Sequence, residues 1–398
     1  MAELGESGGS GSGDDGKVKP HKFAARITSV DFIDSVTVGL DGARVSSPHW
    51  TLAGKDDILQ DWSRLAKRIK AATRSYSKKP AAYTLPGGRK VKLEIEVTLS
   101  ENVSGSGKVE GTFGPLIIKG TCPTAVGKHT VDATITAWAD AIDAQVGKMA
   151  WFIHLKDPAV TWSLGSTFVE VYLLMDKPAK MYSGGVPAEA LRFLTLKAKV
   201  LGKKTAHEVG IAVTTYLHSS HGMKYDVTGG ASFFDARPTS TSNFSVVNYA
   251  FKKEETVNCY DQAAAVQSLS GAVGAVIGWI FMQPYGYINP TSLVGVKGIC
   301  NNPFYLAKHP FYHTNLPHID ANDPRRTEFH NHAFCSLASN IFDACAGPHL
   351  GTENLAQYIS AAIDHKTALN ASSSMYPGTA ASANSYPGVV STTLTNSV

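Results

Sequence analysis

The sequence predicts an α+β protein in which an N-terminal antiparallel β-sandwich is followed by a second domain that contains helices. Three observations lead to this prediction. The chain of 398 residues is long for a single hydrophobic core. Apolar and polar residues alternate with a period of two before residue 180, and apolar residues recur at helical spacing after Pro187. We therefore expect a flexible leader at 1–21, the β-sandwich at 22–180, the second domain at 181–367 and a flexible tail at 368–398.

The clearest strand pattern lies at residues 90–99, where every second residue is Val, Leu or Ile and the residues between them are Lys, Glu or Thr. Residues 130–137 alternate in the same way. Such alternation is typical of a strand with one buried face. A helical insertion is expected near 57–73, and the basic residues between Arg64 and Lys79 fit a solvated helix face.

Charge and hydropathy argue against two classes of partner, nucleic acid and the interior of a membrane. The formal charge of +4 is small and spread along the chain, so nucleic-acid binding is not indicated. The segment Met1–Lys19 has no apolar stretch typical of a secretory signal. The apolar run Gly271–Met282 is shorter than the ~20 residues of a membrane-spanning helix. We expect no membrane span, and a protein that is cytoplasmic or exported without a cleavable signal peptide.

Helical spacing begins after the predicted domain boundary. Pro187 suits the first turn of a helix that runs to about Ala198. Thr205 is a plausible N-cap for the next helix, in which Val209, Val213 and Tyr216 are spaced to share one face.

Cys259 is the cysteine whose surroundings point to chemistry. The chain holds five cysteines, too few and too scattered for a disulfide framework. Cys259 follows an extended segment and opens an alanine-rich helix. Backbone N–H groups and the helix dipole at such a position favour a thiolate, which is the nucleophilic form, and the same N–H groups could bind an oxyanion.

The segment Asn258-Cys259-Tyr260-Asp261-Gln262-Ala263 resembles the Gly/Asn-x-Cys-aromatic-x-x-Ala signature of the transglutaminase-like superfamily. Two later segments strengthen the resemblance: His332-Ala333-Phe334 and Phe342-Asp343-Ala344 are similar to the strands that carry the histidine and aspartate of that family, in the same order. The resemblance implies a papain-like, transglutaminase-like catalytic core at 181–367, with Cys259 as nucleophile and His332 and Asp343 as its partners.

A predicted hairpin explains how His332 and Asp343 would meet. A turn near 336–339 would place His332 and Asp343 opposite one another on adjacent antiparallel strands, so that the carboxylate can orient the imidazole. The chain departs from the family pattern in two places. Residues 283–326 form an insertion that we expect to line or cover the cleft, and Cys345 stands where a threonine is usual.

Other assignments of these residues remain open. His330 is the alternative base, because it would share a strand face with His332. His330, His332 and Cys335 could together hold zinc, but only half of a structural zinc pattern is visible, so no metal or other cofactor is predicted. Asp261 is better explained as compensation of the helix dipole than as a catalytic acid.

Three functions follow from this sequence. The preferred one is a cysteine peptidase or amide hydrolase that works through a thioester and acts on a peptide or protein, including peptidoglycan peptides. The second is a transamidase that crosslinks proteins on the same core. The third is a binding or scaffold protein with a degenerate core. The β-domain and the absent signal favour a bacterial effector delivered by a dedicated system; the sequence leaves the oligomeric state open.

Overall fold

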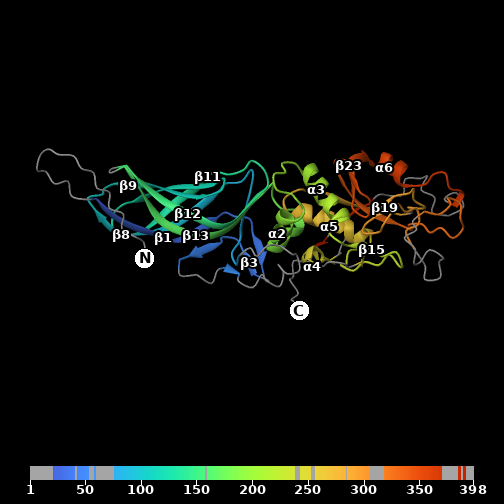
Figure 1. Cartoon of the computed structure of the whole chain (residues 1–398), viewed down its shortest axis with the longest axis horizontal. Helices are drawn as coiled ribbons and strands as arrows, with labels where there is room; N and C mark the ends of the chain where they lie inside the picture. Colours follow the sequence, from blue (N-terminus) through green and yellow to red (C-terminus); the bar gives the residue numbers. More distant parts are fainter. Residues whose placement is uncertain are drawn as a thin grey trace, which may run out of the picture.

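The computed structural model describes residues 21–40, 43–52, 58–59, 76–156, 159–237, 243–251, 256–283, 285–304, 318–369, 384–386 and 389–390. The protein contains both strands and helices, with more strand than helix, and it has one large curled sheet. In Figure 1 this sheet lies on the left, and the helices gather on the right. The described residues contain no helix that is both long and apolar enough to span a membrane.

The large sheet has nine strands. Their order is β4 (His49–Thr51), β1 (Lys22–Ile33), β8 (Lys90–Glu101), β11 (Gly127–Ala137), β10 (Leu116–Pro123), β9 (Ser106–Phe113), β12 (Asp143–Leu155), β13 (Val160–Leu174) and β7 (Ala81–Thr84). All neighbours are antiparallel except β13 and β7, which are parallel. The strands predicted at 90–99 and 130–137 are confirmed as β8 and β11.

The sheet curls around a core of its own. Buried and exposed residues alternate along β8, and Leu93 and Ile95 pack in the same cluster as Trp151 of β12. β1 and β13 are far apart in the strand order, yet Phe23 at one end of β1 lies 6.2 Å from Trp162 of β13, measured between ring centroids. The strands are half-buried and, apart from the β13–β7 pair, antiparallel, as predicted. All nine belong to one hydrogen-bonded sheet. The predicted sandwich, in which two sheets pack face to face, stays a prediction.

A buried ion pair joins the large sheet to the helical part. Glu170 of β13 and Arg192 of the helix α2 (Ala188–Leu196) are both fully buried, and Arg192 Nε donates to Glu170 Oε1 over 2.8 Å. Tyr172 adds a hydrogen bond of 2.7 Å to the same oxygen. A three-stranded sheet of β14 (Val186–Pro187), β2 (Val38–Leu40) and β3 (Ala43–Val45) also crosses the boundary.

The second half packs helices against a five-stranded sheet. The sheet order is β23 (His349–Asn354), β21 (Asn340–Asp343), β20 (His332–Leu337), β18 (Gly278–Met282) and β24 (Asn384–Tyr386). The helices after α2 are α3 (Ala206–Ser219), α4 (Val246–Phe251), α5 (Cys259–Ala272) and α6 (Leu355–Ala362). Every residue of α5 except Tyr260 is buried, so this helix is the centre of the second core.

Local sequence signals set the ends of these elements. Pro187 stands at the N-cap of α2, one residue before the helical turn in which it was predicted. Thr205 caps α3 as predicted, and it shares a capping box with Glu208. Ala338 and Ser339 take positive φ angles of 48° and 72° and form the turn between β20 and β21.

Short elements complete the described chain. They are the strands β5 (Ile58–Leu59), β6 (Tyr76–Ser77), β15 (Lys224–Tyr225), β16 (Asn243–Phe244), β17 (Thr256–Val257), β19 (Ser292–Leu293), β22 (Ala346–Gly347) and β25 (Val389–Val390), and the 3-10 helix η2 (Lys180–Tyr182). Apart from β5, the helical insertion predicted near 57–73 lies outside the described residues, as do residues 1–20 of the predicted leader. The same is true of most of the predicted tail, although β24 and β25 pair with β18 and β16.

Candidate active site

Cys259 is the first residue of α5, and its position is fixed by the helix cap. Asn258 is the N-cap: its side chain accepts a hydrogen bond of 3.1 Å from the amide of Asp261. The amide of Gln262 bonds to the carbonyl of Asn258. Within the described part of the chain, the amides of Cys259 and Tyr260 have no acceptor, as expected for a first helical turn. Two backbone donors are therefore available beside the sulfur.

Asp261 anchors a loop against this helix start. Its carboxylate accepts hydrogen bonds from the hydroxyl of Ser232 at 2.7 Å and from the amides of Phe233 and Phe234 at 3.0 and 3.3 Å. Burial raises the pKa of Asp261 to about 6, although these hydrogen bonds oppose the shift. Asp261 thus holds the loop in addition to occupying the positive end of the helix dipole.

His332 and Asp343 meet across the hairpin of β20 and β21. The paired register ends at Cys335 and Phe342. If this register is continued by one residue, Asp343 lies opposite Phe334. His332 is therefore a diagonal neighbour of Asp343 on the same face of the sheet, and not its direct cross-strand partner as we predicted. The side chains close this gap, and His332 Nε2 lies 2.8 Å from Asp343 Oδ2.

The Asp343 carboxylate is held by four donors. Oδ2 also accepts a hydrogen bond of 2.9 Å from the hydroxyl of Tyr358 on α6. Oδ1 accepts from the amides of Cys345 and Ala346 at 2.7 and 3.1 Å. Burial alone would raise the pKa of Asp343, but the charge of His332 and its hydrogen bond outweigh burial and lower the pKa below its usual value. Asp343 is therefore a fixed, ionised partner for the imidazole.

Aromatic side chains enclose the His332 ring. Phe329 stacks on it with ring centroids 5.0 Å apart, and Tyr285 lies 4.8 Å away on the same measure. The Tyr285 hydroxyl is 2.9 Å from that of Tyr358, so a closed chain of contacts runs from His332 through Asp343, Tyr358 and Tyr285 back to His332. The ring is completely buried. These contacts fix its orientation.

The environment of His332 favours the imidazolium. Burial lowers its pKa, but the charge and hydrogen bond of Asp343, together with the Cys259 side chain, outweigh burial and raise the pKa from 6.5 to about 10. Because Nε2 faces Asp343, Nδ1 is the nitrogen left for Cys259. Among the described residues, no atom forms a well-aligned hydrogen bond with Nδ1. The Cys259 sulfur is nevertheless close enough to raise the pKa of the ring.

Two contacts align β20 with α5. The hydroxyl of Tyr260, next to Cys259, donates to the side chain of Asn331, next to His332. Further along, the thiol of Cys335 donates to the carbonyl of Ala263 over 3.2 Å. The segment that carries the imidazole is thus joined directly to the helix start that carries the sulfur.

The other histidine candidate lies outside this cluster. The side chain of His330 is 70% exposed and its Nδ1 is 3.7 Å from a carboxylate oxygen of Glu328. Because strand β20 begins only at His332, the alternation that would put both histidines on one face does not apply. Cys335 faces α5, and the described residues contain no group of three or more His, Cys, Asp or Glu side chains arranged to bind a metal.

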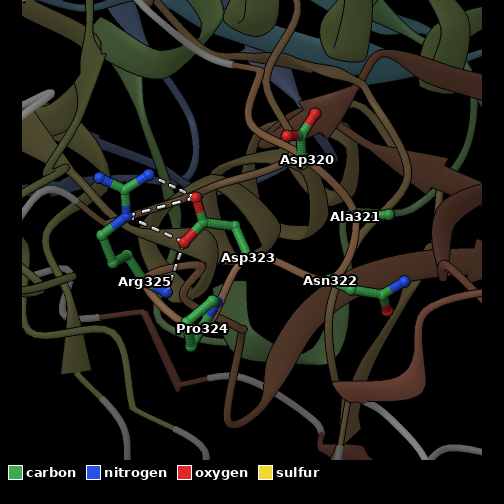
Figure 2. A pocket seen from close by; sticks show the side chains of 6 residues that line it. All are labelled: Asp320, Ala321, Asn322, Asp323, Pro324 and Arg325. Atoms are coloured by element: carbon green, nitrogen blue, oxygen red, sulfur yellow. Dashed lines mark hydrogen bonds and ion pairs between the residues drawn. The ribbon is translucent and has the colours of Figure 1, made fainter.

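Part of the predicted insertion contributes to the site. Tyr285, which contacts His332, belongs to it, and so does Arg326, which bonds to Asp364 over 2.8 Å at the far end of the segment. A shallow hollow lies in the same segment, lined by residues 320–325 (Figure 2). There Arg325 bonds to Asp323 over 2.9 Å while Asp320 points away from both. None of the elements that carry Cys259, His332 or Asp343 lines this hollow.

Several residues at the site were not singled out by sequence. Tyr358 and Tyr285 carry no motif, and Asn331 is recognisable only because it precedes His332. Tyr260 was visible as the aromatic residue of the cysteine signature, but its bond to Asn331 was not.

Comparisons with known proteins add no assignment: neither the protein-family models nor the curated proteins that were searched contain a match to this chain. The geometry of the site therefore carries the functional argument.

Proposed function

We propose that this protein is a cysteine-dependent amide hydrolase with a papain-like, transglutaminase-like catalytic core, and that it acts on a peptide or protein. The observation that carries the proposal is the arrangement around His332. One ring nitrogen is fixed by an ionised Asp343 at 2.8 Å, and the other is left for Cys259 at a helix start. A sulfur, an imidazole and a carboxylate in this order are the parts of a nucleophilic triad.

The reaction follows from these positions. The Cys259 thiolate attacks the amide carbonyl, a carbon–sulfur bond forms, and the π electrons move to the oxygen. The oxyanion accepts hydrogen bonds from the free amides of Cys259 and Tyr260. When the carbonyl re-forms, the carbon–nitrogen bond breaks and the His332 imidazolium gives its proton to the leaving amine. Water then gives a proton to the neutral imidazole and attacks the thioester carbonyl. A carbon–oxygen bond forms, the carbon–sulfur bond breaks, and the acid leaves while Cys259 returns to the thiolate beside the imidazolium.

Acyl transfer is the second candidate, and the enclosure of His332 is what favours it. The ring is fully buried among Phe329, Tyr285 and Phe334, which limits the access of water to the thioester. A primary amine could then compete with water as acceptor. Adding a primary amine to a hydrolysis reaction separates the two, because only a transamidase converts the acyl group into a new amide.

Alkylation by iodoacetamide tests the reactive cysteine. All five thiols are free and buried. Burial raises the pKa of Cys122 to about 11, and burial also raises the pKa of Cys335 and of Cys345 well above their usual value. We expect alkylation of Cys259 to be faster than that of the other four, as measured by peptide mass spectrometry over time.

Cys259 is also the most exposed of the five thiols, at 5%. Histidine variants therefore have to separate activation of the thiol by His332 from its greater exposure. His332→Ala should slow the alkylation of Cys259 to the rate of an ordinary thiol. His330→Ala is the matched control, since it removes an exposed histidine two residues away and should leave the rate unchanged. Equal rates in all three proteins would contradict the proposal and favour a scaffold.

A further inference from the structure

Tyr225 is a buried tyrosine close to the start of α5, and its hydroxyl bonds to none of the residues that the structure describes. The residue is only 3% exposed and lies in β15, where it pairs with Val257 of β17, two residues before Cys259. Its ring packs against Phe304 and Phe329. Within the described part of the chain the hydroxyl makes no hydrogen bond, and hydrogen bonds do not contribute to its pKa shift. A buried tyrosine ordinarily bonds its hydroxyl to protein, so a hydroxyl that has no partner among the described residues is available to a ligand.

The contacts of Gly230 locate this hydroxyl beside the helix start. The carbonyl of Gly230 accepts a hydrogen bond of 2.9 Å from the side chain of Asn258, the residue before Cys259. A Cβ atom built on Gly230 would lie 3.6 Å from the Tyr225 hydroxyl. Gly230 has a φ angle of +62°, which glycine adopts without strain, so this close approach of loop, hydroxyl and helix cap is built into the backbone.

The hydroxyl is kept in its donor form. Burial, and then the negative charges of Cys345 and Cys259, raise the pKa of Tyr225 well above its usual value. At neutral pH the phenol therefore keeps its proton and can donate it in a hydrogen bond. The influence of Cys259 also agrees with a position close to the sulfur.

We infer that Tyr225 is a further catalytic residue, whose hydroxyl donates a hydrogen bond to the oxyanion formed when Cys259 attacks a carbonyl, together with the free amides of Cys259 and Tyr260. This inference rests on the proposed function. The bond changes are those of the acylation step: the carbon–sulfur bond forms and the carbonyl π electrons move to oxygen. Tyr225 stabilises that oxygen without transferring its proton. Removing one such donor typically lowers the rate by about a hundredfold or more.

Two reagents that act on the same sulfur test this role without knowledge of the substrate. 4-Nitrophenyl acetate acylates a thiolate through an oxyanion, whereas iodoacetamide alkylates it by direct displacement and forms none. In Tyr225→Phe we expect acylation of Cys259 to fall about a hundredfold and alkylation to stay within about twofold of the wild type. The thermal unfolding midpoint should be unchanged, because the lost hydroxyl bonds to none of the described residues.

A matched variant and three outcomes complete the test. Tyr216→Phe removes a half-buried tyrosine hydroxyl of α3 and should alter neither rate. Unchanged acylation in Tyr225→Phe would overturn the inference. An equal fall of acylation and alkylation would also overturn it, because Tyr225 would then act on the thiolate or on the fold. Slow, unselective alkylation of the wild type is a different failure, which contradicts the proposed function itself.

Discussion

Tyr358 of α6 donates a hydrogen bond of 2.9 Å to Asp343 Oδ2, the same oxygen that lies 2.8 Å from His332 Nε2. One carboxylate oxygen thus connects the helix α6, the strand β21 and the strand β20. The carboxylate has no freedom to rotate, since its other oxygen accepts two backbone amides. Tyr358 is therefore a positioning residue for the proposed triad.

Replacing Tyr358 by phenylalanine tests this role. The variant removes one of four donors to a buried carboxylate and leaves the Tyr285 hydroxyl without its partner. We expect a loss of about 1–2 kcal/mol in the free energy of unfolding and a several-fold slower alkylation of Cys259, with the pH dependence of alkylation altered. Tyr182→Phe is the control: its hydroxyl bonds to the carbonyl of Ser268, so stability should fall while the alkylation rate stays constant.

The pH dependence of the His332–Asp343 pair has a definite sign. The pKa of His332 is raised to about 10, so the pair stabilises the folded protein fully below about pH 6.5, and this contribution is lost as the pH rises towards 10. The imidazolium also persists through neutral pH, so the step that needs its proton should continue into the alkaline range. A nuclear magnetic resonance titration of the His332 ring measures this directly.

Asp343→Asn gives the contrast for that titration. With the carboxylate charge gone, burial dominates and the pKa of His332 should fall below its usual value. A His332 resonance that titrates near pH 6.5 in both proteins would show that Asp343 does not control the imidazole.

Asp261 predicts a second pH effect, at lower pH. Its pKa in the folded protein is about 6, above the usual 3.8, so the folded state binds a proton more tightly than the unfolded state. Stability from this group therefore rises as the pH falls through 6. Between pH 7.5 and 5 the gain should be about 1 kcal/mol. Urea unfolding at the two pH values should show this gain in the wild type and not in Asp261→Asn; equal behaviour would contradict the assignment.

The buried pair of Glu170 and Arg192 predicts that the stability of each half depends on its contact with the other. Glu170→Gln leaves the buried Arg192 without its carboxylate partner, which should cost about 3–5 kcal/mol of unfolding free energy. The double variant Glu170→Gln with Arg192→Met removes the buried charge and should recover part of that loss. Chemical denaturation of the three proteins provides the measurement, and a neutral single variant would show that the pair does not hold the halves together.

Local patterns in the sequence predicted much of the fold. The alternation at 90–99 predicted β8, because the period of side chains in a strand is a local property. The capping residue Thr205 predicted the start of α3, and the change from an extended segment to an alanine-rich run predicted the start of α5, for the same reason. Strand pairing is not local: alternation shows that one face is buried but not that β7 would pair in parallel with β13, or that nine strands would form one curled sheet.

The candidate site divides in the same way. Cys259, His332 and Asp343 were chosen from short motifs, and the structure brings their segments together at α5, β20 and β21. Tyr358 and Tyr285 were not chosen, because each reaches the site through tertiary packing from a segment without a recognisable motif. The diagonal relation of His332 to Asp343 likewise depends on the tight turn at 338–339, whose length the sequence did not specify.

The most direct test is to observe the thioester. Reaction of the full chain with 4-nitrophenyl acetate, followed by intact and peptide mass spectrometry, should show one acetyl group on each chain, located on Cys259 and lost again as water hydrolyses it. Cys259→Ala and His332→Ala should carry no such group. Acetylation spread over lysines and other thiols, or equal acetylation of Cys259 in the wild type and His332→Ala, would contradict the proposed triad.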